Sequence, residues 1–177
     1  MPDELDEELA IMEERANELD KKLDFTISIN EPIEKLVYKE PVIVSKDAKV
    51  IDAIRLFNEK DVGCVLIVEN KKLIGIFTER DVIRKLIVNH LDIKKETIEK
   101  HMTKNPDSLF LSDPIPYALN RMSAGGYRHV PLVNKNNYPV GVISIRDIVE
   151  HLANYYPNEI LNIPPSPHRK QKRPEGE

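Results

Sequence analysis

Two short stretches of the chain carry the same chemically useful residues in the same order. They are Gly75-Ile-Phe-Thr-Glu-Arg-Asp81 and Gly141-Val-Ile-Ser-Ile-Arg-Asp147. In each, a glycine is followed by two apolar residues, a hydroxyl residue, one further residue and an Arg-Asp pair, and matching positions lie 66 residues apart. A spacing this regular predicts two copies of one structural unit.

The hydroxyl and the carboxylate of each stretch support two interpretations. A hydroxyl residue followed by an acid three positions later is typical of a capping box, in which each side chain satisfies a free amide of the first helical turn. The same groups at a helix N-terminus could also bind a ligand: the carboxylate accepts the hydroxyls of a ribose, and the amides favour an anion. For a single copy, capping alone is the favoured interpretation. The glycines fit where a strand leaves room for a ligand or for neighbouring backbone.

The surrounding residues predict the elements that position each stretch. Apolar runs at 64–68 and 73–77, separated by the turn-forming residues 69–71, predict a β-hairpin. A short extended run at 42–44 and a helix over 50–57 precede it, and a second helix opens at Thr78. The apolar face predicted for this second helix consists of Val82, Ile83, Leu86 and Ile87.

The β-α-β-β-α order is repeated from Ile98 onward. Matching residues are offset by 65 until Val133 and by 66 from Gly141, so one extra residue falls in the loop around 134–137. A surface turn accepts such an insertion at little cost. Each unit alone is too small to bury much apolar surface, so we expect the two to share a core. The predicted fold class is α/β (α+β), with two packed repeats and an N-terminal helix.

The flanking segments differ from the repeats in composition. Residues 3–24 hold ten acidic and three basic residues, and their apolar positions follow the period of a short coiled-coil seam: Leu5, Leu9, Met12, Ala16, Leu19 and Leu23. This predicts a helix that either lies on the body or serves dimerisation or docking. We divide the chain into a lead-in (1–29), a first repeat (30–91), a second repeat (92–155) and an extended strap with a disordered basic tail (156–177).

Bulk properties exclude several classes of function. The central body is nearly neutral, which disfavours nucleic acid as a partner. No apolar run approaches the roughly 20 residues that span a bilayer, so no membrane partner is expected. A single cysteine, Cys64, excludes an intrachain disulfide and suits the cytoplasm. The five histidines are scattered and no nucleophile is paired with a base, so we expect no metal site, no catalytic residues and no enzymatic activity.

From about Ile33 to Tyr155 the chain resembles a tandem pair of CBS domains, a Bateman module. The β-α-β-β-α order, the hairpin that ends in the glycine–hydroxyl–Arg-Asp pattern, and its occurrence twice in register carry this resemblance. It implies a pseudo-twofold pair of repeats with two clefts for an adenosine-containing ligand and no cofactor. AMP, ADP or ATP is expected ahead of S-adenosylmethionine or NAD. The ligand-binding hydroxyl and Asp positions implied by the resemblance are Thr78, Asp81, Ser144 and Asp147.

The resemblance also implies which residues form the other walls of the clefts. The Asp147 cleft would have Val62, Gly63 and Cys64 beside the base and Arg128 and His129 near the phosphate. The Asp81 cleft would have the reverse, with Tyr127, Arg128 and His129 beside the base and the uncharged Gly63 and Cys64 near the phosphate. Ala53 and Ala118, which match across the repeats, complete the expected ligand-binding set. The structural alternative is that Arg128 pairs with a surface acid and that His129 is half-buried. Charge near the phosphate predicts that the Asp147 cleft binds nucleotides first.

Two functions of different classes follow. The first is a regulatory module that senses an adenine nucleotide and signals through an effector protein or through self-association, as a homodimer. The second is a structural or adaptor protein that docks a partner through its N-terminal helix and binds no physiological nucleotide.

Overall fold

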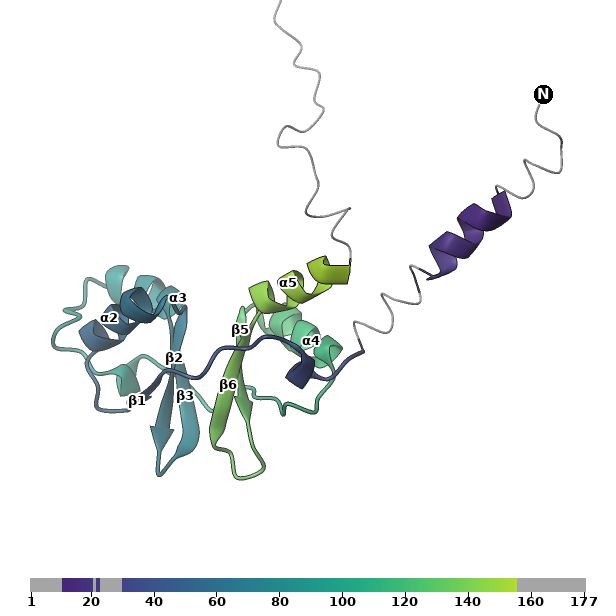
Figure 1. Ribbon diagram of the computed structural model, residues 1–177. Helices are drawn as coiled ribbons and strands as arrows, with labels where there is room; N and C mark the ends of the chain where they lie inside the picture. The colour runs from purple at the N-terminus through teal and green to yellow at the C-terminus, as the bar shows by residue number, and fades with distance from the viewer. Residues whose placement is uncertain (1–10, 21, 23–29, 156–177) are drawn as a thin grey trace, which may run out of the picture.

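The computed structural model describes residues 11–20, 22 and 30–155, which form a mixed α/β fold of two similar lobes (Figure 1). The predicted fold class and the β-α-β-β-α order are confirmed. Figure 1 shows the lobes side by side, with the hairpins meeting in the middle and the helices at the end of the hairpins away from their tips.

The first lobe is built around a tight hairpin. Its elements are β1 (Ile43–Ser45), α2 (Val50–Lys60), β2 (Cys64–Glu69), β3 (Lys72–Thr78), the helical turn α3 (Glu79–Asp81) and the π-helix η2 (Val82–Ile87). Asn70 and Lys71 both have positive φ, which is the backbone of the two-residue turns that suit the twist of a hairpin. The turn predicted at 69–71 is therefore present.

The second repeat follows this plan with small changes. Its elements are β4 (Thr103–Lys104), α4 (Ile115–Gly125), β5 (His129–Val133), β6 (Pro139–Ser144) and α5 (Ile145–Tyr155), and short 3-10 helices precede the repeats at η1 (Ile33–Lys35) and η3 (Ile98–Lys100). The parallel pairing of β1 with β2 is reduced here to a single bridge between Leu109 and Leu132. The extra residue lies in the hairpin loop, as expected. There Asn137 accepts from the Leu73 amide at 2.9 Å, so the loop joins the two hairpins.

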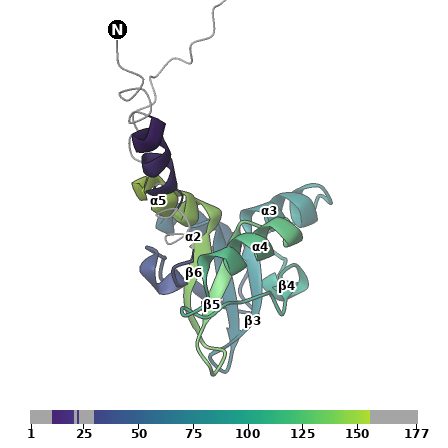
Figure 2. The ribbon, with the colours of Figure 1, turned by 90° about the vertical axis from the view of Figure 1, so that its right-hand side faces the viewer.

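Each repeat contributes its first segment to the other lobe. The larger sheet has the order β1-β2-β3-β4, and β4 comes from the second repeat. In the other direction, Lys39 forms a bridge with Val142 of β6. The amide of Ile33 donates to the Asp113 carbonyl and the amide of Ile98 donates to the Ala48 carbonyl, both at 2.9 Å. Figure 2 shows the resulting association of β3, β4 and the second-lobe hairpin.

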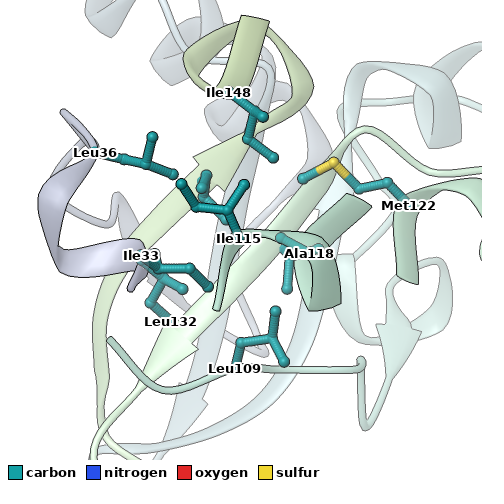
Figure 3. Close-up of a cluster of buried hydrophobic side chains, with 10 residues drawn as sticks. Ile33, Leu36, Leu109, Ile115, Ala118, Met122, Leu132 and Ile148 are labelled. Carbon is teal, nitrogen blue, oxygen red and sulfur yellow. The ribbon is translucent and has the colours of Figure 1, made fainter. Parts of the chain in front are cut away.

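The cores follow this exchange. In the second lobe, Ile33 and Leu36 of the first repeat are buried among side chains of α4, α5 and β5 (Figure 3). In the first lobe, Ile98 of the second repeat is fully buried beside Phe77. A third buried cluster lies between the two hairpins and consists of Cys64, Leu66, Leu73, Ile76, Val133 and Val142. Neither lobe is complete without residues from the other repeat.

The two motif glycines accommodate the exchanged segments. A Cβ on Gly141 would lie 2.6 Å from Cδ2 of Tyr38, and a Cβ on Gly75 would collide with the side chain of Met102. Tyr38 and Met102 both belong to the segments that cross between lobes. The sequence left open whether these glycines make room for a ligand or for neighbouring backbone. The structure shows that they make room for a neighbouring segment of the chain.

The apolar face predicted after Thr78 is only partly buried. Leu86 is buried, but Ile83 and Ile87 are 60% and 55% exposed, because this segment forms a π-helix whose wider turn changes which positions face the core.

The predicted N-terminal helix is described only in part. Residues 11–20 are helical and exposed throughout. Leu5, Leu9, Leu23, the extended lead-in and residues 156–177 lie outside the described residues.

Candidate functional site

Both repeated motifs form capping boxes. The Thr78 hydroxyl accepts from the Asp81 amide at 3.3 Å, and the Asp81 carboxylate accepts from the Thr78 amide at 2.9 Å. Ser144 and Asp147 make the same reciprocal pair, at 3.3 and 2.6 Å. The structural interpretation of the motif is therefore present in both copies, and it fixes the orientation of each carboxylate at the entrance of its helix.

The second oxygen of each aspartate has a different environment. Oδ1 of Asp81 lies 2.7 Å from Nζ of Lys85, one turn further along the helix, and Lys85 also donates to the carbonyl of His101. At the position equivalent to Lys85 the second repeat has His151, which faces Glu31 instead. Among the described residues Oδ1 of Asp147 has no hydrogen-bond or ion-pair partner. The Asp147 carboxylate is therefore the more available one for a ligand hydroxyl.

A cavity of about 560 Å³ lies in front of Ser144 and Asp147. We call it the Asp147 cleft. The structure places the predicted residues Val62, Gly63, Cys64, Arg128 and His129 in its lining. Sequence reasoning missed its remaining members, which are Lys39, Glu40, Val42, Phe57, Asp61, Glu79, Val142, Ile145, Arg146 and Glu150.

A second cavity, of about 540 Å³, lies in front of Thr78 and Asp81. We call it the Asp81 cleft. Its lining includes the predicted Tyr127, Arg128, His129 and Gly63, whereas Cys64, which was also predicted there, does not line it. Sequence reasoning missed its other members, which are Ile76, Glu79, Arg80, Ile83, Arg84, Thr103, Pro106 and Asp107. Of the exposed π-helix residues, Ile83 thus serves as a cleft wall.

The two clefts share one wall, formed by Gly63, Glu79, Arg128 and His129. Gly63 is needed for close packing here, because a Cβ would lie 2.8 Å from Cε1 of His129. Arg128 is exposed and lines both clefts.

Burial sets the protonation of three lining residues. Desolvation lowers the pKa of His129, and the nearby Asp147 only partly opposes this, so the imidazole is neutral at pH 7. Desolvation, with a smaller contribution from Glu79, raises the pKa of the Cys64 thiol to about 12. Desolvation and a 2.8 Å hydrogen bond to Asp107 raise the pKa of Tyr127 to about 12. All three residues therefore enter the clefts as uncharged groups.

Two predicted site residues lie elsewhere. Ala53 and Ala118 are fully buried, in the cores of the first and second lobes, and line neither cleft. Their match across the repeats reflects equivalent packing of α2 and α4. Some of the missed residues lie inside the two motif stretches, beside the residues that were predicted: Ile76, Glu79, Arg80, Val142, Ile145 and Arg146. The others come from the crossing segments 39–42 and 103–107, from the end of α2 and from the turn after each aspartate, and no motif marks them. Within the described residues no group of three or more His, Cys, Asp or Glu side chains is arranged to hold a metal ion.

These features define a pair of pseudo-symmetric repeats with a cleft at each capping-box carboxylate. The CBS domain family profile matches residues 25–88 and 96–154, and the chain belongs to this family. The predicted recognition as a tandem pair of CBS domains is confirmed.

Relatives of known sequence share the repeat region. An uncharacterised 17.7 kDa protein of Acidianus ambivalens is 26% identical over 115 residues, which cover 64% of this chain and 68% of that one. The uncharacterised protein MJ1225 of Methanocaldococcus jannaschii is 29% identical over 131 residues, 73% of this chain and 46% of that one. For the Arabidopsis thaliana protein CBSCBSPB1 the match spans 19% of the relative's length. The chain thus corresponds to a part of several relatives.

Solved structures share the fold. A putative signal-transduction protein with CBS domains from Burkholderia ambifaria is 29% identical, with a TM-score of 0.61 over 66% of this chain and 85% of that one. A CBS domain protein from Pyrobaculum aerophilum, complexed with AMP, is 26% identical, with a TM-score of 0.62 over 70% and 98%. The CBS domain pair of protein MJ0100, in complex with 5′-methylthioadenosine and S-adenosyl-L-methionine, is 25% identical, with a TM-score of 0.61 over 67% and 97%.

No helix among the described residues is both long and apolar enough to cross a membrane.

Proposed function

We propose that this protein is a regulatory module that binds an adenosine-containing ligand in its two clefts, with AMP, ADP or ATP as the favoured nucleotides. The observation that carries this proposal is the Asp147 carboxylate. A capping box fixes one of its oxygens, while the other has no partner among the described residues and borders a cavity of about 560 Å³. A carboxylate held in this way accepts the hydroxyls of a ribose without further reorganisation.

The ligands of similar proteins support the choice of an adenosine group. AMP, 5′-methylthioadenosine and S-adenosyl-L-methionine are the ligands of the two structural neighbours described above. They share an adenine and a ribose and differ at the 5′ position. The common chemistry is therefore an adenosyl group, recognised at the ribose by Asp147 or Asp81 and at the base by the apolar wall residues such as Val62 and Tyr127.

Calorimetric titration with adenosine and AMP tests the proposal. Asp147→Asn keeps an acceptor for the Ser144 amide but removes the charge that a ribose hydroxyl prefers, and we expect adenosine affinity in this cleft to fall about tenfold or more. Glu59→Gln, on the exposed face of α2 outside both clefts, is the matched control and should leave affinity unchanged. Absence of adenosine binding at millimolar concentration in the unaltered protein would refute the proposal.

The output would pass through self-association or an effector protein in the cytoplasm, without catalysis by this chain. Exposed apolar side chains occur at equivalent places on η2 and α5, at Ile83 and Val149, together with Ile87 and Val88. Exposed apolar residues at equivalent places of the two repeats are suited to an interface between two copies of the chain. Light scattering on the full chain and on a variant lacking residues 1–24 would detect it, and a monomer at tens of micromolar in both would contradict it.

The adaptor function retains one supporting observation. Residues 11–20 form an exposed helix on which Ile11, Met12 and Leu19 are each at least half exposed. A helix with unburied apolar side chains is suited to docking on a partner. If adenosine ligands fail to bind while removal of residues 1–24 abolishes self-association or partner capture, the adaptor function is the better account.

A further inference from the structure

The two clefts are similar in size but differ in charge. The Asp147 cleft is lined by five carboxylates and three cationic side chains, whereas the Asp81 cleft is lined by three of each. The carboxylates of the first are Glu40, Asp61, Glu79, Asp147 and Glu150, and its cations are Lys39, Arg128 and Arg146. Those of the second are Glu79, Asp81 and Asp107, with Arg80, Arg84 and Arg128 as the cations. His129 lines both clefts, and its lowered pKa keeps it neutral at pH 7.

The difference arises at equivalent positions of the two repeats. Three residues after the motif aspartate, the Asp81 cleft has Arg84 and the Asp147 cleft has Glu150. Residues three apart on a helix lie on the same face, so each of these charges accompanies its aspartate. The αL residue that ends the preceding helix is Asp61 in one repeat and Gly126 in the other, and Asp61 lines the Asp147 cleft.

Local ion pairs widen the contrast. In the Asp81 cleft, two carboxylates lie near further cations outside the lining: Asp81 is 2.7 Å from Lys85, and Asp107 is 3.9 Å from Arg121. Arg84 and Arg128 have no such partner among the described residues. The Asp81 cleft therefore presents an excess of positive charge to a ligand.

In the Asp147 cleft the ion pairing leaves the excess of carboxylates unchanged. The pair of Arg146 with Glu150, at 2.8 Å, neutralises one cation and one carboxylate of the lining. Lys39 and Arg128 then face Glu40, Asp61, Glu79 and Asp147. Lys39 is directed to the end of α2 by its 3.0 Å hydrogen bond to the Asp61 carbonyl. The Asp147 cleft therefore keeps an excess of negative charge.

We propose that the two clefts select adenosyl ligands of different charge: the Asp81 cleft takes the phosphate-bearing ligand, and the Asp147 cleft takes an adenosyl ligand without a 5′ phosphate. This selectivity rests on the proposed binding of adenosine-containing ligands. It reverses the order expected from the sequence for nucleotides, because Arg128 serves both clefts, whereas Glu40 and Asp61 face only the Asp147 cleft. The more available carboxylate of Asp147 then serves a neutral or cationic ligand that lacks phosphate.

The test compares adenosine, AMP and 5′-methylthioadenosine in full-length chains with one cleft weakened. In Asp81→Asn, where the Asp147 cleft dominates, we expect AMP to bind about five- to tenfold more weakly than adenosine at low salt. 5′-Methylthioadenosine should bind there at least as well as adenosine. In Asp147→Asn, where the Asp81 cleft dominates, AMP should bind about five- to tenfold more tightly than adenosine.

Charge-neutralising variants then assign the selectivity to residues. Glu40→Gln with Asp61→Asn, added to Asp81→Asn, should remove most of the discrimination against AMP, and asparagine tolerates the left-handed backbone of position 61. Arg84→Gln, added to Asp147→Asn, should remove most of the preference for AMP. Glu59→Gln is the control in both backgrounds, and raising the salt concentration should shrink both preferences.

The outcomes separate this inference from the proposed function. If adenosine binds and the ratio of AMP affinity to adenosine affinity is the same in both backgrounds, the proposed charge selectivity is wrong and the adenosine-binding function stands. If the preferences differ but survive the neutralising variants, the named charges are not their source, and the inference is overturned as well. If adenosine binds neither cleft at millimolar concentration, both fail.

Discussion

The lysine that follows Asp81 by one turn is the clearest difference between the two motif carboxylates. Lys85 occupies Oδ1 of Asp81 and is itself half-buried, so a ligand hydroxyl must displace it. The equivalent His151 makes no such contact with Asp147. The sequence shows the Asp-to-Lys spacing of an ion pair, but an aspartate in a capping box has two oxygens, and only the structure shows that the lysine contacts Oδ1.

Replacing Lys85 should therefore open the Asp81 cleft to a neutral ligand. In the Asp147→Asn background, Lys85→Met is expected to raise adenosine affinity about three- to tenfold, because the hydroxyl no longer competes with an ammonium group for Oδ1. Calorimetry measures the change. Lys85→Arg, which keeps the positive charge, is the control and should show little gain. An unchanged affinity for adenosine in Lys85→Met would mean that Asp81 does not contact the ribose.

The buried His129 should make the stability of the folded protein depend on pH. Its folded pKa lies below the ordinary value of about 6.5 because burial disfavours the imidazolium. The unfolded chain therefore binds the proton more readily, so the free energy of unfolding should fall as the pH drops through about 6.5 toward the folded pKa. Denaturant titrations of the unaltered protein and of His129→Gln between pH 7.5 and 5 measure this. A loss of stability that is equally steep in both would remove His129 as a cause.

At the scale of elements, the hairpins and helices followed from local pattern, whereas the exchange between lobes did not. The apolar runs at 64–68 and 73–77 and the turn between them are local signals, and they gave the correct elements. The segments before β1 and around η3 pair with the other repeat instead of their own. A repeat of 65 or 66 residues has the same sequence pattern whether its first segment packs in its own lobe or in the other lobe. The sequence alone therefore does not distinguish the two arrangements.

The glycine at position 141 reports on this exchange. Gly141→Ala would place a Cβ 2.6 Å from the Tyr38 ring and 3.3 Å from Leu132, within a packed core. We expect a loss of about 1–3 kcal/mol in the free energy of unfolding, since overpacking displaces the crossing segment. Denaturant titration measures it. Lys72→Ala, at an exposed position of β3, is the control and should stay within about 0.5 kcal/mol.

The two clefts show the same division between local and long-range information. Thr78, Asp81, Ser144 and Asp147 were predicted from a seven-residue motif, and their capping geometry is local. Glu40 and Asp61 reach the Asp147 cleft only because the crossing segment and the end of α2 meet there. Ala53 and Ala118 were wrongly grouped with the clefts because a residue matched between repeats can be matched for packing as well as for binding.

For the molecule as a whole, the two repeats form one folding unit whose lobes do not coincide with the repeats. The first lobe needs η3 and β4, which follow residue 91, and it does not use η1, which packs in the second lobe. A cut at the sequence boundary therefore damages both lobes. It removes Ile98 from the first core and leaves Ile33 and Leu36 without partners.

Two fragments of similar length test this packing. Residues 42–105 contain all strands and helices of the first lobe, whereas residues 30–91 follow the first repeat and lack the strand and core residues supplied from beyond it. We expect 42–105 to retain more helix by circular dichroism and slower amide exchange in β2 and β3, because those strands keep the neighbouring β4 and the Ile98 side chain. Both fragments expose the cluster between the hairpins, so neither should match the full chain in stability.

Sharp, cooperative unfolding of 30–91 with less structure in 42–105 would show that the repeat, and not the lobe, is the unit that folds. The reverse result would identify the exchanged segments as the reason why a single repeat is incomplete.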